Sequence, residues 1–209
     1  MARYRQGQGK EMGMRHIREA LRLGLSCGVS SRDIGRSLKI SHFSAQKYLR
    51  IAHEAGLDWN FVQDNVSLSR RGALRGLHFQ NPAPQGKLVF VLQGEVFDVA
   101  VDLRRSSPNF GKWVGVVLSA DNHRQLWVPP GFAHGFVVTS DSAEFLYKTT
   151  DYWYPEFERS LLWNDQTVGV VWPIDGLPQL AAKDVAGKTL AEAEVFMNDL
   201  GDVAHIWHA

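Results

Sequence analysis

The sequence predicts a mainly β protein with a jelly-roll body, preceded by a small all-α segment. Short runs of Val, Phe, Leu and Trp recur roughly every ten residues after Asn60. Up to Leu57, apolar residues recur at helical spacing instead. Charge divides at the same place, with 11 Lys and Arg against 4 Asp and Glu up to Leu57 and 12 against 18 beyond it. We therefore expect two domains, residues 1–57 and 58–209.

Composition places the chain among folded, soluble proteins, because 44% of its 209 residues are hydrophobic and 22% are charged. No apolar stretch approaches the ~20 residues that span a bilayer, and the N-terminus has no apolar core of the signal-peptide type. The single cysteine, Cys27, excludes an intramolecular disulfide and a cysteine metal cluster. We expect a cytoplasmic protein without membrane association.

The basic segment predicts three helices. The first covers residues 14–25, where apolar residues recur at helical spacing. Ser30 and Ser31 are both good N-cap residues for the second helix, and Ser41 suits the N-cap of the third, which Gly56 ends. Three helices with a tight turn between the second and third describe a helix-turn-helix unit.

The string SRDIGRSLKISHFSAQKYLRIAHEAGL, residues 31–57, resembles the N-terminal helix-turn-helix of insertion-sequence transposases. The resemblance implies a recognition helix over residues 41–50 whose polar side chains face a major groove and its phosphates. The side chains expected to contact DNA are His42, Ser44, Gln46, Lys47 and Arg50. The alternative interpretation is a basic three-helix appendage that binds nothing.

The second segment is rich in strand signals. The clearest predicted strands are residues 87–91, 95–101, 113–118, 125–128 and 144–149. Turns are expected at Gly94 and at residues 109–111 and 129–131. Many short strands with regular turns favour a jelly roll or a related barrel, the class that includes cupins, so a cupin-like jelly roll is predicted. A short terminal helix is expected over residues 189–196.

Several motifs in this segment occur in a specific order. They are FVQDN at residues 61–65, LRGLHFQ at 74–80, QGKLV at 85–89, LWVPPGFAHGF at 126–136, EFLYKTTDYW at 144–153, WND at 163–165, VWP at 171–173 and AAKD at 181–184. Together they resemble the dTDP-4-dehydrorhamnose 3,5-epimerase family from Phe61 to Phe196. Several independent motifs in the right order are far more specific than any one of them.

The resemblance implies an isomerase that epimerises C3 and C5 of dTDP-4-dehydro-6-deoxy-glucose in dTDP-L-rhamnose synthesis. The C4 ketone of that sugar acidifies the C–H bonds at both carbons. Each inversion needs a base on one face of the ring, stabilisation of an enolate, and an acid on the other face. Because the ketone itself is the electron sink, no cofactor and no metal is expected.

Four residues match the catalytic positions of the family. His78 is the expected base, since an imidazole titrates close to neutral pH. The resemblance pairs it with Asp184, which would fix the ring tautomer and stabilise the imidazolium. Tyr147 is the expected acid on the opposite face, and Lys87 would place positive charge beside the enolate oxygen.

A second set of positions matches residues that bind the substrate. These are Gln63, Asp64, Asn65, Arg75, His134, Glu158 and Lys183. Arg75 is expected to pair with the diphosphate, because its planar fork donates two parallel hydrogen bonds. His134 is expected in a turn within PPGFAHGF. Metal-binding cupins carry a two-histidine HxH motif that LHFQ lacks, and two scattered histidines make a poor metal site.

The N-terminal segment departs from the family. Its members normally open with a β-rich segment that contains a D-x-R-G-x-F-x-E motif, contacts the nucleotide and crosses to the partner of a homodimer. Nothing in residues 1–60 matches that motif. We therefore expect a weakened homodimer. One phosphate-binding Arg of the family is missing, which should cost ~1.5–3 kcal/mol of diphosphate binding. The expected result is a weakened or inactive epimerase rather than a new enzyme.

Two other functions remain open from the sequence. One is a transcription regulator that joins the helix-turn-helix to a cupin-like domain that senses a sugar nucleotide without converting it. The complete set of His78, Asp184 and Tyr147 favours the enzyme, since a sensor needs neither a base nor an opposed acid. The other is a related epimerase that acts at one carbon only, or an isomerase with a different keto sugar.

Overall fold

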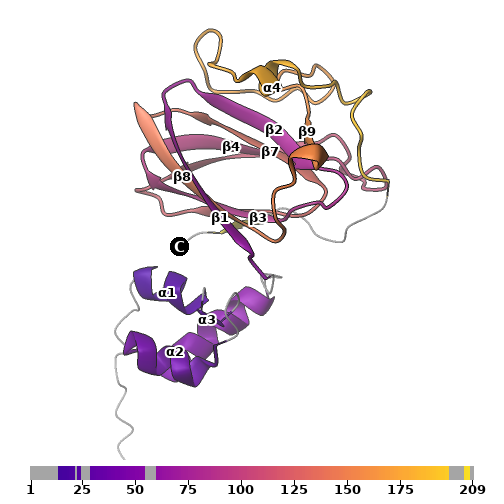
Figure 1. The fold of residues 1–209 in the computed structure, drawn as a ribbon. Coiled ribbons are helices and arrows are strands. Elements are labelled where there is room, and N and C mark those ends of the chain that lie inside the picture. Colours follow the sequence, from indigo (N-terminus) through magenta and orange to yellow (C-terminus); the bar gives the residue numbers. More distant parts are fainter. Residues whose placement is uncertain (1–13, 22, 25–28, 55–59, 198–204, 208–209) are drawn as a thin grey trace, which may run out of the picture. The chain divides into compact units, whose positions relative to one another are not determined.

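The computed structural model describes residues 14–21, 23–24, 29–54, 60–197 and 205–207. The chain divides into two compact units, Met1–Phe61 and Val62–Ala209. The first contains helices and the second contains two antiparallel sheets (Figure 1). The predicted boundary at residue 57 falls among residues 55–59, outside the described residues, so it stays a prediction.

The helical unit contains α1 (Met14–Leu21), α2 (Ser31–Leu38) and α3 (His42–Glu54). Ser30 is the N-cap of α2, because its hydroxyl accepts a hydrogen bond from the amide of Asp33 at 3.3 Å. Satisfying an amide of the first turn in this way stabilises the start of a helix. The expected end of the first helix at residue 25 and the expected stop at Gly56 lie outside the described residues.

A small core holds the helices together. Ala20, Ile34 and Ala45 come from α1, α2 and α3 respectively, and all three are fully buried. Leu38 and Leu49 pack against them. Each helix therefore gives one apolar face to a shared centre, as the helical periodicity predicts.

The β unit is built from two five-stranded sheets. In order, sheet one contains β1 (Gln63–Arg70), β8 (Ser142–Thr149), β3 (Lys87–Gln93), β6 (Gln125–Val128) and β10 (His205–Trp207). Sheet two contains β5 (Trp113–Ser119), β4 (Glu95–Asp102), β7 (Phe132–Val138), β2 (Leu74–Gln80) and β9 (Glu158–Ser160). The five predicted strands are confirmed as β3, β4, β5, β6 and β8, and the predicted mainly β, cupin-like class is confirmed.

In sheet two, β4 and β7 are packed on both faces. Val96 and Ala100 of β4 belong to the core shared with sheet one, whereas Val99 and Val101 of the same strand belong to a second core. Residues 161–196 close that second core, and Figure 1 shows them with α4 (Ala182–Val185) over the outer side of β2, β4 and β7. A strand buried on both faces loses its apolar–polar alternation.

This double burial explains why the sequence did not predict β7, one of the strands outside the predicted runs. All seven residues of β7 are buried, so FAHGFVV contains no exposed polar position. The expected turn around His134 is therefore wrong. The turn ends before β7 begins at Phe132. His134 lies within the strand and is paired with Ala100 of β4 and His78 of β2.

The predicted helix over residues 189–196 is also wrong. A single turn forms where the amides of Glu192 and Ala193 donate to the carbonyl of Thr189. The chain then extends, and Phe196 forms a parallel bridge with Arg104 while its ring is buried in the second core. Burial of that aromatic ring outweighs the helical preference of a segment that is too short to form a stable helix by itself.

A substitution at Gly76 tests how closely the backbones of β2 and β7 pack against each other. The φ of Gly76 is +124°, and a Cβ there would lie 2.5 Å from Cα of Gly135. We expect Gly76→Ala to lower the free energy of unfolding by at least ~2 kcal/mol, through backbone strain and a backbone clash. Gly72→Ala is the matched control, because Gly72 also has a positive φ but nothing within 4 Å. If urea unfolding shows that both variants lose the same free energy of unfolding, a backbone clash at Gly76 is not the cause.

Candidate active site

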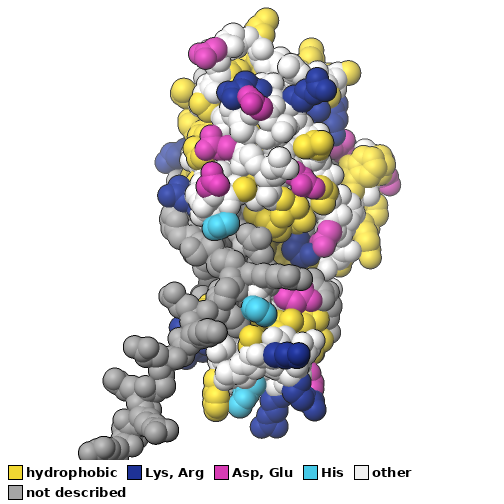
Figure 2. Space-filling model, turned by 90° about the vertical axis from the view of Figure 1, so that its left-hand side faces the viewer, with side chains coloured by type: hydrophobic (Ala, Val, Ile, Leu, Met, Phe, Trp, Pro, Cys, Tyr) yellow, Lys and Arg dark blue, Asp and Glu magenta, His cyan; other side chains and the backbone are white. Residues whose placement is uncertain are grey.

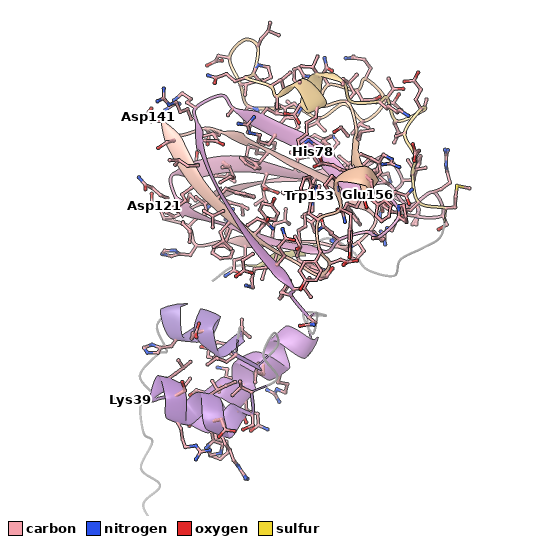
Figure 3. All side chains as sticks on the ribbon, in the orientation of Figure 1. Lys39, His78, Asp121, Asp141, Trp153 and Glu156 are labelled. Atoms are coloured by element: carbon pink, nitrogen blue, oxygen red, sulfur yellow. The ribbon has the colours of Figure 1, made fainter. Side chains whose placement is uncertain are left out.

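A cavity of about 230 Å³ lies between the two sheets of the β unit. Sheet one contributes Gln63, Asn65, Lys87 and Tyr147, and sheet two contributes His78, Phe79, Gln80 and Glu158. Gln85, Trp153 and Lys183 complete the lining. In Figure 3, His78, Trp153 and Glu156 lie at one end of the β sandwich, away from Asp121 and Asp141.

His78 and Asp184 form the predicted dyad. Nε2 of His78, in β2, lies 2.6 Å from Oδ1 of Asp184, in α4. The Asp184 carboxylate is fully buried and also accepts hydrogen bonds from the amides of Gly76 at 3.2 Å and Ala181 at 3.0 Å. An ionised carboxylate only accepts, so Nε2 carries the proton and Nδ1 keeps a lone pair.

The environment keeps this dyad in the form that a base requires. Burial lowers the pKa of His78 below its ordinary value of 6.5, and the hydrogen bond that His78 donates to Asp184 only partly opposes this effect. Burial by itself would raise the pKa of Asp184, but hydrogen bonds from His78 and two backbone amides hold it below 3.8. At neutral pH the pair is therefore a neutral imidazole and a carboxylate.

Tyr147 and Lys87 face this dyad from the other sheet. Tyr147 pairs in register with Asn65 of β1 and Val89 of β3, and Lys87 begins β3 opposite Thr149. Burial, with help from the Glu158 carboxylate, raises the pKa of Tyr147 above 10, so its phenol stays protonated. Burial lowers the pKa of Lys87 to about 8, although the charges of Glu158 and Asp98 oppose this.

Three of the expected substrate contacts do not line the cavity. Asp64 lies between Gln63 and Asn65, and successive residues of a strand point to opposite faces. Its carboxylate is 57% exposed and pairs with Lys148. Arg75 is exposed, and its expected pairing with a diphosphate stays a prediction.

His134, the third of these residues, is buried one layer behind the lining. Its Nε2 lies 2.9 and 3.0 Å from the two carboxylate oxygens of Asp98, which is fully buried. Burial raises the pKa of Asp98, partly offset by His134 and Lys87. The His134 ring stacks at 6.1 Å on Phe145, which itself contacts the Tyr147 ring. His134 is thus placed to support the wall of the cavity.

Sequence reasoning missed four lining residues, Phe79, Gln80, Gln85 and Trp153. A usable signal existed for one of them, because Gln80 follows His78 by two positions and so shares its face of β2. Phe79, Gln85 and Trp153 also belong to the motifs, but only the tertiary structure shows that they line the cavity.

The described part of the chain contains no group of three or more His, Cys, Asp or Glu arranged to hold a metal ion. The same residues include no helix with the length and apolar character needed to cross a bilayer. The expectation that no cofactor is needed stays a prediction.

Comparison with known proteins decides the family. The family model described as dTDP-4-dehydrorhamnose 3,5-epimerase matches residues 32–192. The chain belongs to this family. The match begins earlier than the expected start near residue 60, and so it includes most of the helical unit that the structure describes.

Curated relatives of this epimerase family are closely similar. The dTDP-4-dehydrorhamnose 3,5-epimerase of Pseudomonas aeruginosa is 61% identical over 137 residues, which cover 66% of this chain and 76% of that protein. The Salmonella typhimurium enzyme of the same name is 60% identical over 134 residues, 64% of this chain and 73% of that protein.

Solved epimerases also share the fold. A 3,5-epimerase from Legionella pneumophila, in complex with dTDP-4-keto-L-rhamnose, has a TM-score of 0.69 at 50% identity and covers 72% of this chain and 81% of that one. ChmJ, a 3'-monoepimerase from Streptomyces bikiniensis in complex with dTDP-quinovose, has a TM-score of 0.65 at 34% identity and covers 69% and 74%. The predicted family is therefore confirmed, while the transposase resemblance stays a prediction.

Proposed function

We propose that this chain, an isomerase of the epimerase family, inverts C3 and C5 of dTDP-4-dehydro-6-deoxy-glucose without a cofactor, in dTDP-L-rhamnose synthesis. The observation that carries the proposal is the placement of His78 and Tyr147 on opposite sheets around one cavity. A base and an acid on two sides of a bound ring are what inversion requires. We place this reaction in the cytoplasm, in keeping with the single cysteine.

The proposed chemistry balances at each carbon. Nδ1 of His78 removes the proton from C3 or C5, and the C–H electrons move into the C4 carbonyl to give an enolate. The ammonium of Lys87 stabilises the enolate oxygen. The phenol of Tyr147 then donates a proton to the opposite face of the carbon, and the carbonyl re-forms. Transfer of a proton from the His78 imidazolium to Tyr147 through solvent restores both groups.

The remaining lining residues suit the nucleotide portion. Gln63 and Asn65 are joined by a 2.7 Å hydrogen bond on the inner side of β1. Lys183 and Glu158 form an ion pair at 2.8 Å on the other side of the cavity. Their amide, ammonium and carboxylate groups offer the donors and acceptors that a base, a deoxyribose and a diphosphate require.

Deuterium wash-in tests the function directly. The chain is incubated with the dTDP-4-keto sugar in heavy water, and NMR follows deuterium at C3 and C5 together with the configuration of the product. We expect uptake at both carbons. Uptake at one carbon would identify a monoepimerase, and tight binding of the sugar nucleotide without uptake would identify a sensor.

The pKa values predict a bell-shaped pH dependence of kcat/KM. His78 must be neutral, and its pKa lies below 6.5, so activity rises with pH on an acid limb centred below pH 6.5. Lys87 must be charged, and its pKa is about 8, so activity falls as pH rises through about 8. In Lys87→Arg the guanidinium stays charged, and the alkaline limb is expected to disappear. A profile of Lys87→Arg with an unchanged alkaline limb would remove Lys87 from this role.

We also propose a homodimer that is weaker than those of relatives with the N-terminal β segment. β1 is the edge strand of sheet one, and its Val66 and Leu68 are 57% and 74% exposed. An exposed apolar edge favours pairing with a second copy. Light scattering should give a mass that rises with concentration from that of the 23.5 kDa chain, and Leu68→Asp should suppress the rise.

DNA binding by the helical unit is the second function that we propose. Phe43, Gln46, Lys47 and Arg50 are exposed at spacings of three and four residues, which places them on one face of α3. Basic side chains project from this unit in Figure 2. The expected contacts His42 and Ser44 are only partly exposed. This arrangement suits a helix that enters a major groove.

Salt dependence tests this second function. A random-sequence 20-base-pair duplex is titrated by fluorescence anisotropy at several salt concentrations. The double substitution Lys47→Ala/Arg50→Ala is expected to reduce the salt slope of binding by about two. Lys112→Ala, which removes an exposed lysine from the β unit, is the control. Absence of binding by the unsubstituted chain at low salt would end this proposal.

A further inference from the structure

Lys87 is the only lysine among the described residues that is buried. It begins β3, is 9% exposed, and lines the cavity between the two sheets. Lys183 lines the same cavity but is exposed, and Lys112 is an exposed lysine outside it. The amine of Lys87 is therefore enclosed in a cavity of about 230 Å³ rather than in bulk water.

The amine of Lys87 has no direct partner within the described part of the chain. No hydrogen bond or ion pair of those residues reaches its Nζ, although the charges of Glu158 and Asp98 act on it. Asp98 bonds His134 at 2.9 Å, and Glu158 pairs with Lys183 at 2.8 Å. A buried ammonium without a paired carboxylate is costly, so the neutral amine is favoured.

The pKa of Lys87 agrees with this environment. Burial lowers it to about 8, the charge of Lys183 acts in the same direction, and the charges of Glu158 and Asp98 oppose the change. At pH 7 about one such amine in ten is neutral, against about one in 3,000 at the ordinary value of 10.5. Only a neutral amine is a nucleophile, so burial activates Lys87.

Tyr147 and His78 can supply the proton transfers that an amine nucleophile needs. Tyr147 pairs with Val89, two residues along β3 from Lys87, so both side chains lie on the cavity face of sheet one. Its phenol stays protonated and can act as an acid. His78 lines the cavity from sheet two with a free lone pair on Nδ1 and can act as a base. An amine, an acid and a base thus line one cavity.

We propose that Lys87 is a covalent capture site for short-chain aldehydes, which it binds as an imine. The amine nitrogen attacks the carbonyl carbon, and His78 carries a proton from that nitrogen to the oxygen to give a carbinolamine. Tyr147 protonates the hydroxyl, which leaves as water while the C=N bond forms. The iminium nitrogen returns its proton to Tyr147, so one amine and one aldehyde give one imine and one water.

Capture and epimerisation use different protonation states of Lys87. The ammonium serves the enolate in the proposed epimerisation, whereas the neutral amine captures the aldehyde. The inference goes beyond the proposed function, because capture needs the cavity and its amine but no nucleotide. A captured aldehyde occupies the cavity, so capture also blocks the sugar ring.

Reductive trapping with propionaldehyde tests the inference. The full chain is incubated briefly with the aldehyde, sodium borohydride reduces the imine to a secondary amine, and mass spectrometry of peptides measures the initial rate at each lysine. Exposed Lys112 is the internal reference. At pH 7 Lys87 should be labelled at least about tenfold faster than Lys112, and its rate should level off above about pH 8.

Three controls connect the labelling to the cavity. In urea, Lys87 and Lys112 should be labelled at similar rates, because unfolding removes the burial. Tyr147→Phe should slow labelling of Lys87 at least about tenfold and leave Lys112 unchanged, since the acid is missing. Lys183→Arg keeps the positive charge but removes the other lysine of the cavity, and it should leave labelling of Lys87 unchanged.

Each outcome of the trapping experiment decides the inference. Slower labelling of Lys87 than of Lys112 at pH 7, or a Lys87 rate that still rises about tenfold from pH 9 to pH 10, overturns it. The epimerase proposal then stands or falls on the heavy-water assay alone. Preferential labelling of Lys87 that levels off near pH 8 supports the capture site, even in a chain that exchanges neither carbon of the keto sugar.

Discussion

His78→Ala is expected to lower kcat by ~10²–10⁴-fold and to remove deuterium uptake at both C3 and C5. Both exchanges depend on the single neutral imidazole whose Nε2 is held 2.6 Å from Asp184. Alanine leaves the cavity open but supplies no base. Deuterium NMR and the rate of product formation, measured together, should show the two losses in parallel.

Two further variants show how the result for His78→Ala is to be interpreted. His16→Ala changes an exposed histidine of the helical unit and should not affect exchange. Asp184→Asn keeps the shape of the partner but removes the charge that stabilises the imidazolium, so it should reduce kcat as well. Normal exchange in His78→Ala would show that another group removes the protons, and the proposed mechanism would be wrong.

Tyr147→Phe is expected to separate exchange from inversion. His78 still removes and returns a proton on its own face, so deuterium uptake at C3 and C5 should continue. Formation of the inverted product should fall by ~10²–10⁴-fold, because the acid on the other face is missing. The ring itself stays in place, since its contact with Phe145 at 6.0 Å does not involve the hydroxyl.

The measurement follows exchange and product configuration in one NMR time course. Tyr152→Phe removes the hydroxyl of a tyrosine that is 55% exposed and does not line the cavity, and it should behave like the unsubstituted chain. If Tyr147→Phe loses exchange and inversion to the same extent, Tyr147 does not act as the opposed acid.

Strand prediction succeeded where turn residues mark the ends of a run and failed where a strand has no exposed polar position. The runs at β3, β4 and β8 have turn residues at their ends and were predicted close to their observed bounds. β7 was missed because both of its faces are buried, which removes the period of two. Residues 189–196 were assigned to a helix because local pattern does not reveal the core that buries Phe196.

In the candidate site, too, some residues could be identified from sequence motifs, whereas others are recognised only from their contacts in the structure. Motifs identified His78, Lys87, Tyr147 and Asp184 without any knowledge of contacts. They also suggested Asp64, which the strand period directs to the opposite face from Gln63 and Asn65. The strand period could have placed Gln80 on the face of His78, but the hydrogen bonds of Gln80 and Gln85 to the backbone of Tyr152 and Asp151 leave no pattern in the sequence.

By itself the sequence indicated the family, the mainly β class and the residues proposed for catalysis, because these depend on ordered motifs and on local periodicity. The family resemblance implied the pairing of His78 with Asp184, but only the tertiary structure showed their 2.6 Å contact across 106 residues of chain and the placement of Tyr147 on the other sheet. Such contacts depend on antiparallel pairing and on burial between distant segments. Those forces act on the folded chain as a whole, and no local stretch of sequence records them.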